Sequence, residues 1–279
     1  MSDRVSSLAW SGERGEHWRA NLDGLEAMLE PVDEALITAL DLPDATRIGD
    51  IGCGSGATTL ALRHRAEPEA IVHGYDVSPV LLDVARHRAP DLALEFMEAD
   101  VGIHPVPSLP YDRLTSRFGV MFFEEPRVAF GRLLHWLGEG GRFVFAVWGT
   151  PTDNAWATTV RNVVAQLVEL PAPPADAPGP LRYGEPTELV TLLTEVGFAD
   201  VAVESWTGRL PIGLDTTAEG AARFALGAFS TFGRVLAEAG EATRTEAERR
   251  LTEAFASHVV PSQGVRMSAR VHLVSGGRR

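Results

Sequence analysis

The sequence predicts an α/β protein built on a seven-stranded, mostly parallel sheet, with a helical cap before the sheet and a helical lid inserted near its end. Short apolar segments alternate with helical patterns from residue 46 to residue 148, as in a parallel sheet whose strands are joined by helices. Helical patterns interrupt the sheet over residues 216–260. An apolar segment at about 268–275 then predicts an antiparallel last strand.

The cap is predicted from an apolar stripe near the N-terminus. Residues 13–42 carry apolar side chains three or four positions apart, which is the spacing of one helix face. These side chains are Trp18, Leu22, Leu25 and Leu29, followed after Pro31 by Leu36, Ile37 and Leu40. We therefore expect helices over most of this segment.

Five strands with connecting helices are expected next. The strands are expected at about residues 46–51, 71–76, 92–97, 111–116 and 142–148. Helices are expected at about 56–66, from Pro79 onward, and between the fourth and fifth strands. The last of these carries Val128, Phe130, Leu133, Leu134 and Leu137. It is expected to end at Gly138 or Gly140, because glycine commonly follows a helix.

The second half of the chain predicts a flap, a lid and two antiparallel strands. Residues 171–180 are rich in proline and cannot form regular structure, so they are interpreted as a loop or mobile flap inside the domain. A helix is expected at 187–196, and a strand at about 200–207 is expected to pair with the last strand. The resulting divisions are a cap at 1–45, a core at 46–209 with a flap at about 151–185, a lid at 210–265, and the last strand with a tail at 266–279.

Composition excludes several classes of partner. The chain has 279 residues and a formal net charge of -13, which repels phosphate backbones, so no nucleic-acid partner is expected. No apolar run is long enough to cross a bilayer and the first residues lack a signal-peptide core, so no membrane partner is expected. The lone cysteine, Cys53, allows no disulfide within the chain, which predicts a reducing, cytoplasmic location.

Arginine supplies all 25 basic side chains, so the sequence contains no lysine. Codon bias in a GC-rich genome explains this composition. It still has chemical consequences, because it excludes Schiff-base catalysis by lysine, a pyridoxal phosphate anchor and a phosphate-loop lysine.

The most informative pattern is a glycine-rich turn followed by carboxylates at the ends of the next two strands. Asp50 directly precedes the turn at residues 51–56, Asp76 ends the second expected strand, and Asp100 follows the third. Glycine lets a backbone approach a ligand closely. A carboxylate accepts hydrogen bonds from both hydroxyls of a ribose. The pattern therefore predicts a pocket for an adenosine-containing cofactor.

This pattern resembles a known family. The run Asp50-Ile-Gly-Cys-Gly-Ser-Gly56 is similar to the first motif of the Rossmann-like S-adenosylmethionine (SAM)-dependent methyltransferases. The bacterial branch similar to ubiquinone/menaquinone-biosynthesis and natural-product methyltransferases is the nearest in pattern. The resemblance covers roughly residues 15–205 and the last strand. Gly49 departs from it, since the family usually has an apolar residue there, and we expect weaker strand packing as a result.

The resemblance implies SAM as cofactor and S-adenosylhomocysteine (SAH) as product. Asp50 is implied to order the glycine loop and the methionine ammonium, and Asp76 to bind the ribose hydroxyls. Asp100 is implied to accept from the adenine amine, and the Val101 amide to donate to a ring nitrogen. The full set of implied cofactor contacts is Asp50, Gly52, Cys53, Gly54, Asp76, Val77, Asp100, Val101 and Ser116.

The resemblance also places the methyl acceptor after the fourth strand. The residues expected to line its pocket are Trp18, Arg117, Phe118 and Trp148. Arg117 has two interpretations: it binds a carboxylate or phosphate of the substrate, or it pairs with Glu124 or Glu125 to fix a loop, which we prefer. The many aromatic side chains nearby predict a medium-sized, partly apolar small molecule of natural-product type. Its oxygen, nitrogen or carbon nucleophile would take the methyl group by in-line displacement.

Other functions stay open from the sequence alone. Gly52, Gly54 and Ala57 satisfy the looser dinucleotide pattern, with Asp76 at a plausible distance for a ribose, so a nicotinamide-dependent oxidoreductase is an alternative. A methyltransferase acting on a peptide, including carboxyl O-methylation, is another. A SAM-binding protein without catalysis is a third.

The catalytic group itself is not assigned by the sequence. His258 in the lid and Tyr183 near the flap are candidates for a base, which is needed only if the nucleophile must lose a proton. No metal is expected, because Ser116 and Arg117 at the end of the fourth strand are not ligands for hard cations. The chain is expected to be a monomer or a homodimer.

Overall fold

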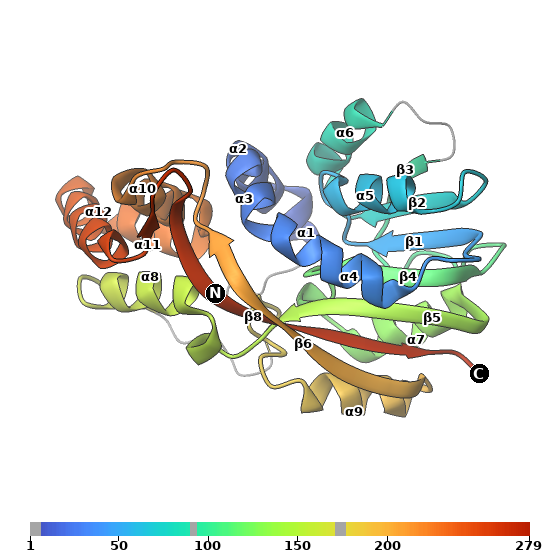
Figure 1. Ribbon diagram of the computed structural model, residues 1–279. Coiled ribbons are helices and arrows are strands. Elements are labelled where there is room, and N and C mark those ends of the chain that lie inside the picture. The colour runs from blue at the N-terminus through green and yellow to red at the C-terminus, as the bar shows by residue number, and fades with distance from the viewer. Residues whose placement is uncertain (1–6, 90–93, 171–176) are drawn as a thin grey trace.

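A seven-stranded sheet forms the centre of the computed structural model, which describes residues 7–89, 94–170 and 177–279 (Figure 1). Its strands run in the order β3-β2-β1-β4-β5-β8-β6. Their bounds are β1 (Arg47–Ile51), β2 (Ile71–Asp76), β3 (Leu94–Glu98), β4 (Tyr111–Arg117), β5 (Leu137–Trp148), β6 (Ala199–Pro211) and β8 (Gly264–Gly277). The first five strands are parallel, and β8 is antiparallel to both β5 and β6. The predicted fold class is confirmed.

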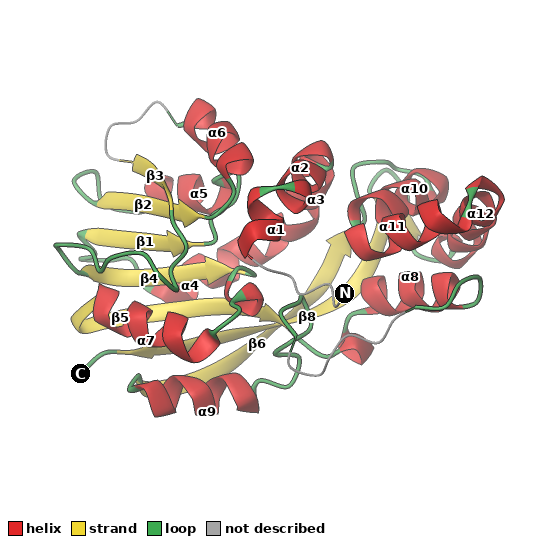
Figure 2. Ribbon diagram, turned by 180° about the vertical axis from the view of Figure 1, so that it is seen from behind, coloured by secondary structure: helices red, strands yellow, loops and turns green. Residues whose placement is uncertain are grey.

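Helices cover both faces of the sheet, which is why its central strands are apolar throughout. On one face α4 (Asp33–Leu40), α5 (Ala57–Arg65) and α6 (Pro79–Arg88) contact the sheet. On the other face α7 (Pro126–Trp136) and α9 (Thr187–Val196) pack together, as seen in Figure 2. Within the described ranges, no helix is long and apolar enough to cross a membrane.

The cap consists of α1 (Ser7–Ser11), α2 (Glu13–Ala20) and α3 (Leu22–Leu29), joined to α4 by the short 3-10 helix Glu30–Val32. Both ribbon views place α2 and α3 between the sheet and the helices of the lid. The predicted apolar stripe faces inward, with Leu25, Leu36 and Leu40 almost fully buried. Residues 1–6 of the predicted cap lie outside the described residues.

The lid helices stand at the far end of a two-stranded ribbon made by β6 and β8, which run past the rest of the sheet (Figure 1). They are α10 (Ala218–Ala228), α11 (Ser230–Ala239) and α12 (Glu241–Ala256). The two-residue strand β7 (Val259–Val260) pairs with the start of β8. This ribbon includes the antiparallel pairing that the sequence predicted.

The segment expected to be a flap contains a helix that the sequence did not predict. Helix α8 (Ala155–Ala165) packs against β8 and α12, with Val160 and Val164 fully buried. Its apolar face is covered only when the lid is in place, so the reason for this helix lies in tertiary packing. Residues 171–176 of the expected flap lie outside the described residues.

The boundary between α7 and β5 also differs from the prediction. The helix ends at Trp136, and Leu137 already pairs with Tyr111 as the first residue of β5. Arg278 donates to the carbonyls of Leu134 and Leu137, at 3.3 and 2.8 Å, and so takes acceptors that a further helical turn would use. Val128, predicted on the apolar face, is 49% exposed.

The position of Gly49 is well packed, although the sequence predicted weak strand packing there. A Cβ added there would lie 2.7 Å from Cδ2 of Leu114 and 3.4 Å from Cδ1 of Tyr111 on β4. The larger side chains of the neighbouring strand therefore fill the space. The expectation of weak packing is wrong, because strand packing is decided by residue pairs and not by one position.

A second glycine joins the cap to the lid. A Cβ added at Gly24 of α3 would lie 2.4 Å from Cε2 of Phe224 on α10, whereas one added at Gly131 of α7 would meet nothing within 4 Å. Alanine is the better helix former, so Gly131→Ala is expected to raise the free energy of unfolding by about 0.5–1 kcal/mol. Gly24→Ala is expected to lower it by about 1–2 kcal/mol, because the helix gain is outweighed by overpacking. Urea unfolding of the matched pair tests this, and equal stability of both variants would contradict the cap–lid contact.

Candidate functional site

Three carboxylates meet at one edge of the sheet, as the sequence predicted. Asp50 lies in β1, Asp76 ends β2, and Asp100 follows β3 by two residues. The register pairs Asp50 with Gly74 and Asp76 with Glu98, so the three parallel strands end side by side. In open α/β sheets, this edge is where ligands bind.

The glycine loop between β1 and α5 is held by close backbone contacts. Gly52 has a φ of 69°, and a Cβ at this position would lie 2.9 Å from the Cα of Gly119, so only glycine fits. The amides of Gly52 and Cys53 both donate to the carbonyl of Tyr75, at 2.7 and 3.0 Å. The Cys53 thiol is buried, and burial raises its pKa, so it is a packed protonated side chain and not a nucleophile.

Asp76 fixes the turns on both sides of it. Its Oδ2 accepts the Gly54 amide and its Oδ1 accepts the Ser78 amide, each at 2.8 Å. Burial raises the pKa of this carboxyl, and the amide donors oppose that rise. Each carboxylate oxygen has a second acceptor position, so Asp76 can hold the loop and still accept two hydroxyls. Val77, the next residue, is half-buried.

Asp100 is bonded to its own loop. Its Oδ1 accepts the Gly102 amide at 2.8 Å, while its backbone carbonyl accepts the amides of Ile103 and His104. Val101 beside it is buried. This geometry turns the segment after β3 back on itself at the edge where Asp50 and Asp76 lie.

Asp50 is the least satisfied of the three carboxylates. It is 1% exposed, and its Oδ2 accepts the Thr59 hydroxyl at 2.7 Å. Its Oδ1 has no hydrogen-bond partner within the described part of the chain. Burial raises the pKa of Asp50 to about 7. An unpartnered buried carboxylate oxygen is costly, so this position fits a ligand that supplies a cationic N–H donor.

Ser116, predicted as a cofactor contact, uses its hydroxyl within the protein. The Ser116 Oγ donates to the Ile51 carbonyl at 2.6 Å and accepts the Gly119 amide at 3.2 Å. It therefore ties the end of β4 to the glycine loop. A direct contact between Ser116 and a cofactor stays a prediction.

Arg117 has a partner that the sequence did not predict. Its Nη1 lies 2.9 and 2.8 Å from the two carboxylate oxygens of Asp33, at the start of α4. Arg117 does form an ion pair within the protein, as the preferred interpretation expected, but its partner is Asp33 and not Glu124 or Glu125. Both side chains are nearly buried, at 10% and 15% exposed, and burial raises the pKa of Asp33 although Arg117 opposes the rise. The pair fastens the start of α4, which directly follows the cap, to the end of β4.

The cap makes further contacts over the same edge. Glu26 of α3 accepts from the Ser55 hydroxyl and from Arg88, the latter at 2.6 Å. Gly15 of α2 lies against Ser78, since a Cβ there would be 2.4 Å from the Ser78 Oγ. The cap thus closes over the glycine loop and the turn after β2.

Trp18, expected in the acceptor pocket, lies in an aromatic group at the cap. Its ring centroid is 5.7 Å from that of Trp10, which is 5.2 Å from Phe122 in the 3-10 helix after β4. The structure therefore places Trp18 beside another cap residue. Its contact with an acceptor stays a prediction.

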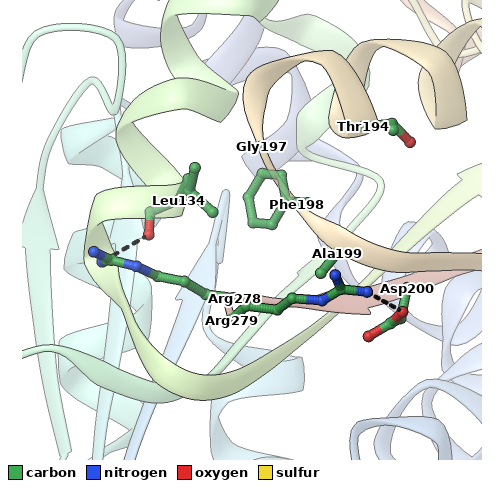
Figure 3. Close-up of a pocket in the computed structure, with 8 residues that line it drawn as sticks. All are labelled: Leu134, Thr194, Gly197, Phe198, Ala199, Asp200, Arg278 and Arg279. Atoms are coloured by element: carbon green, nitrogen blue, oxygen red, sulfur yellow. Dashed lines mark hydrogen bonds and ion pairs between the residues drawn. The ribbon is translucent and has the colours of Figure 1, made fainter.

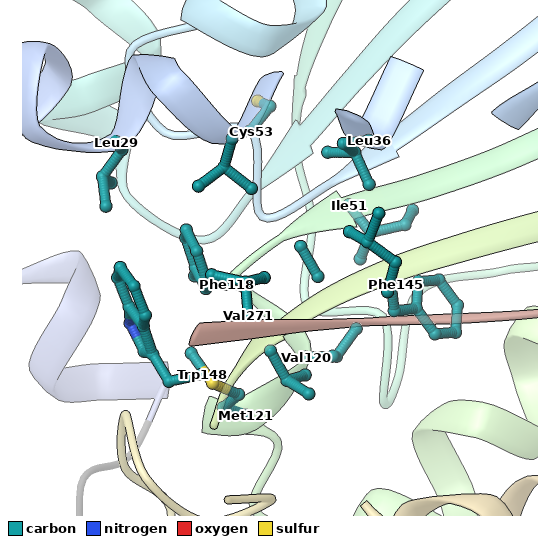
Figure 4. Close-up of a cluster of buried hydrophobic side chains, with 14 of the residues drawn as sticks. Leu29, Leu36, Ile51, Cys53, Phe118, Val120, Met121, Phe145, Trp148 and Val271 are labelled. Carbon is teal, nitrogen blue, oxygen red and sulfur yellow. The ribbon is translucent and has the colours of Figure 1, made fainter. Parts of the chain in front are cut away.

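Phe118 and Trp148, the other expected pocket residues, lie against each other at the ends of β4 and β5. Their rings are stacked with centroids 4.1 Å apart and planes 7° from parallel. Figure 4 shows this pair beside Leu29 of the cap and Val271 of β8. Two residues that are 30 positions apart in the chain thus form one apolar surface next to the carboxylate edge.

The two candidate bases differ in position. Tyr183 is fully buried, its hydroxyl has no partner among the described side chains and backbone, and burial raises its pKa to about 12. It therefore keeps its proton at neutral pH, which argues against a role as base. His258 accepts the Arg266 amide at its carbonyl. Val271 of β8 pairs with Trp148, and Arg266 lies five residues before Val271. His258, which is bonded to Arg266, therefore lies about 17 Å further along the ribbon than Trp148.

A surface hollow lies away from the carboxylate edge. It has a volume of about 530 Å³ and is lined by Phe198, Asp200, Arg278 and Arg279 among others (Figure 3). These residues flank the start of β6 and the end of β8, at the opposite end of the sheet from the carboxylates. In the described ranges, no group of three or more His, Cys, Asp or Glu side chains is arranged to hold a metal ion.

Two residues at this edge, Asp33 and Glu26, were not singled out by the sequence. Their partners, Arg117 and Ser55, lie 84 and 29 positions away. A charged residue on an otherwise apolar helix is only a weak signal of such a contact.

The fold and this edge agree with a known family of domains. Residues 49–145 match the sequence profile of the methyltransferase domain family. These residues therefore form a methyltransferase domain of the Rossmann-like, SAM-dependent class, as the sequence predicted. The alternative of a nicotinamide-binding domain is not supported.

Known relatives agree with this class. The chain is 37% identical over 117 residues to a demethylmenaquinone methyltransferase of Thermus thermophilus, covering 41% of this chain and 53% of the relative. It is 27% identical over 118 residues to the aklanonic acid methyltransferase DauC of a Streptomyces species, covering 41% and 54%. The chain spans about half the length of these curated relatives.

Among solved structures, the YcgJ protein of Bacillus subtilis has the same fold. It aligns with a TM-score of 0.58 over 90% of this chain and 99% of its own, at 16% identity. At that identity the likeness concerns the fold alone.

Proposed function

We propose that the protein is a SAM-dependent methyltransferase whose acceptor is a medium-sized, partly apolar small molecule. The observation that carries the cofactor half of the proposal is the buried Oδ1 of Asp50, which has no hydrogen-bond partner among the described residues. The relatives that act on demethylmenaquinone and aklanonic acid support the acceptor half. The methyl group would go to an oxygen, nitrogen or carbon nucleophile of this acceptor.

The residues of the edge would hold the cofactor in a defined orientation. Asp50 would pair with the methionine ammonium, Asp76 would accept the ribose hydroxyls, and Asp100 with Val101 would bind the adenine. Bound SAM supplies a methyl group already activated by its sulfonium charge. The chain's own contribution would then be to align the acceptor and exclude water, a role that the buried Phe118 and Trp148 are proposed to fill.

The proposal is tested by calorimetric titration with SAH and with NADH. We expect micromolar binding of SAH and no binding of NADH. Transfer of radiolabelled methyl groups from SAM is then measured on a panel of apolar metabolites and of peptides with free carboxyl groups. Tight NADH binding, or labelling of the peptides alone, would contradict the proposed function.

A proton is expected to leave Asp50 when SAH binds. Because the pKa of Asp50 is about 7, most of this carboxyl is protonated at pH 6.5, and a nearby ammonium lowers the pKa. We therefore expect release of roughly 0.7 proton at pH 6.5 and almost none at pH 8.5, where Asp50 is already ionised. Calorimetry in buffers with different ionisation enthalpies measures the release. Equal release at both pH values would contradict the pairing of Asp50 with the ammonium.

A further inference from the structure

A continuous row of aromatic rings leads from the edge of the sheet into the lid. Adjacent rings have centroids 4.1, 5.1, 5.1 and 6.2 Å apart. In order, they are Phe118, Trp148, Trp156, Phe229 and Phe224. The first three are less than 10% exposed. The row joins the end of β4 to helix α10 through side chains with flat apolar faces.

The first ring of the row is held by an unusual backbone. Phe118 has a φ of 63°, in the left-handed region that residues with a Cβ rarely adopt. Its amide still donates to Ala146 of β5 at 3.0 Å, so the strand pairing continues to this residue. Strained residues of this kind gather at functional sites, where the surrounding structure fixes them. Here the ring of Phe118 lies parallel to that of Trp148, with the two planes 7° apart.

The row begins next to the cofactor edge. Gly119, which follows Phe118, is the residue whose backbone approaches Gly52 of the glycine loop. Arg117, which precedes Phe118, is matched in charge by Asp33. The start of the row is therefore close to the cofactor loop. The arginine next to it in sequence is already paired with a carboxylate, so it gives no net attraction for an anionic acceptor.

We propose that the acceptor is a planar, uncharged aromatic molecule that inserts between Phe118 and Trp148 and replaces their contact with each other. This proposal rests on the proposed methyltransferase function. An aromatic acceptor exchanges one stacked contact for two similar ones, so opening the pair is offset by the new contacts. A saturated ring of the same size is thicker and has no π face, so it cannot replace the stacked contact with two new ones.

The acceptor would enter at the outer end of the row, where the cap meets the lid. Phe224 lies against Gly24 of the cap, and His17 of α2 is hydrogen-bonded through Nε2 to the Ala228 carbonyl of α10 at 3.1 Å. The cap and the lid therefore meet at the last two rings. An acceptor reaches Phe118 when this seam between cap and lid opens.

The test compares two ring systems that differ in aromaticity. SAH-loaded protein is titrated with 2-naphthol and with its saturated analogue decahydro-2-naphthol, which have the same skeleton and hydroxyl group. We expect 2-naphthol to bind at least tenfold more tightly, although the saturated ring is the more hydrophobic of the two. In Trp148→Leu the preference should fall below threefold, and in Trp148→Phe it should persist because a stacking face remains.

Trp136→Phe is the matched control. Trp136 is also a buried tryptophan, but its rings pack against Tyr75 and Tyr111, and among the described residues it has no ring contact with the row. Its replacement should leave the preference unchanged. Thermal unfolding of each variant shows whether it is folded, and Trp148→Phe decides the proposal if Trp148→Leu does not fold.

The outcomes separate the two proposals. If SAH binds and both alcohols bind equally, or neither binds, the aromatic acceptor is overturned while the methyltransferase function stands. If SAH does not bind, the proposed function fails. The same titration without SAH then still tests whether the binding of 2-naphthol depends on Trp148. If it does not, the proposed insertion between Phe118 and Trp148 is overturned.

Discussion

Replacing Asp76 with alanine is expected to weaken the binding of SAH by about 100-fold. The carboxylate is proposed to accept two ribose hydroxyls, and two such charged hydrogen bonds at about 1.5 kcal/mol each correspond to that factor. The same carboxylate holds the amides of Gly54 and Ser78, so the variant also loosens the turns that shape the site. Calorimetric titration with SAH measures the loss.

Asp83→Ala is the matched control for this variant. Asp83 lies on α6, not far along the chain, and pairs with Arg86 at the surface. Its replacement should leave SAH binding unchanged, because it has no contact with the glycine loop. If Asp76→Ala binds SAH within about threefold of the wild type, Asp76 is not the ribose-binding acid.

Replacing Arg117 with methionine is expected to lower the free energy of unfolding by about 3 kcal/mol at pH 8. It leaves the nearly buried Asp33 carboxylate without its partner, and removing one member of a buried ion pair is strongly destabilising. The pKa of Asp33 is already raised by burial, and it rises further without Arg117. Since the folded variant binds a proton more readily than the unfolded chain, its stability falls as pH rises. The loss should therefore be smaller at pH 5.

Urea unfolding of three further variants isolates the pair. Asp33→Asn combined with Arg117→Met should recover most of the lost stability, because neither member of the pair is then left charged without its partner. Arg142→Met removes an arginine whose partner Asp41 is half exposed, and should cost less than about 1 kcal/mol. A loss in Arg117→Met no larger than that in Arg142→Met would show that this pair does not fasten the start of α4 to β4.

The sheet and the carboxylate edge followed from local patterns. A strand that ends in an acid, such as β2 with Asp76, is read from a few neighbouring residues, and parallel strands bring their ends to one edge. Asp50 was found because it adjoins the glycine turn. The boundary between α7 and β5 was misplaced because Arg278, a residue far along the chain, takes the carbonyls at the end of the helix.

The partners across the site could not be read from the sequence. Asp33 and Arg117 are separated by 84 positions, and nothing near either residue specifies the other. Helix α8 has an apolar face that is explained only by the lid and β8, which come more than 50 residues later. The stack of Phe118 on Trp148 depends on a positive φ that no residue type at that position predicts.

The sequence by itself determined the parallel sheet, its antiparallel last strand and the cofactor edge, because hydrophobic periodicity and glycine turns act over short distances. Only the tertiary structure decided how the cap closes on that edge, which charges are paired inside it, and which rings face the acceptor. Those features depend on side chains that meet through packing of distant segments, and packing is a property of pairs that no single stretch of chain encodes.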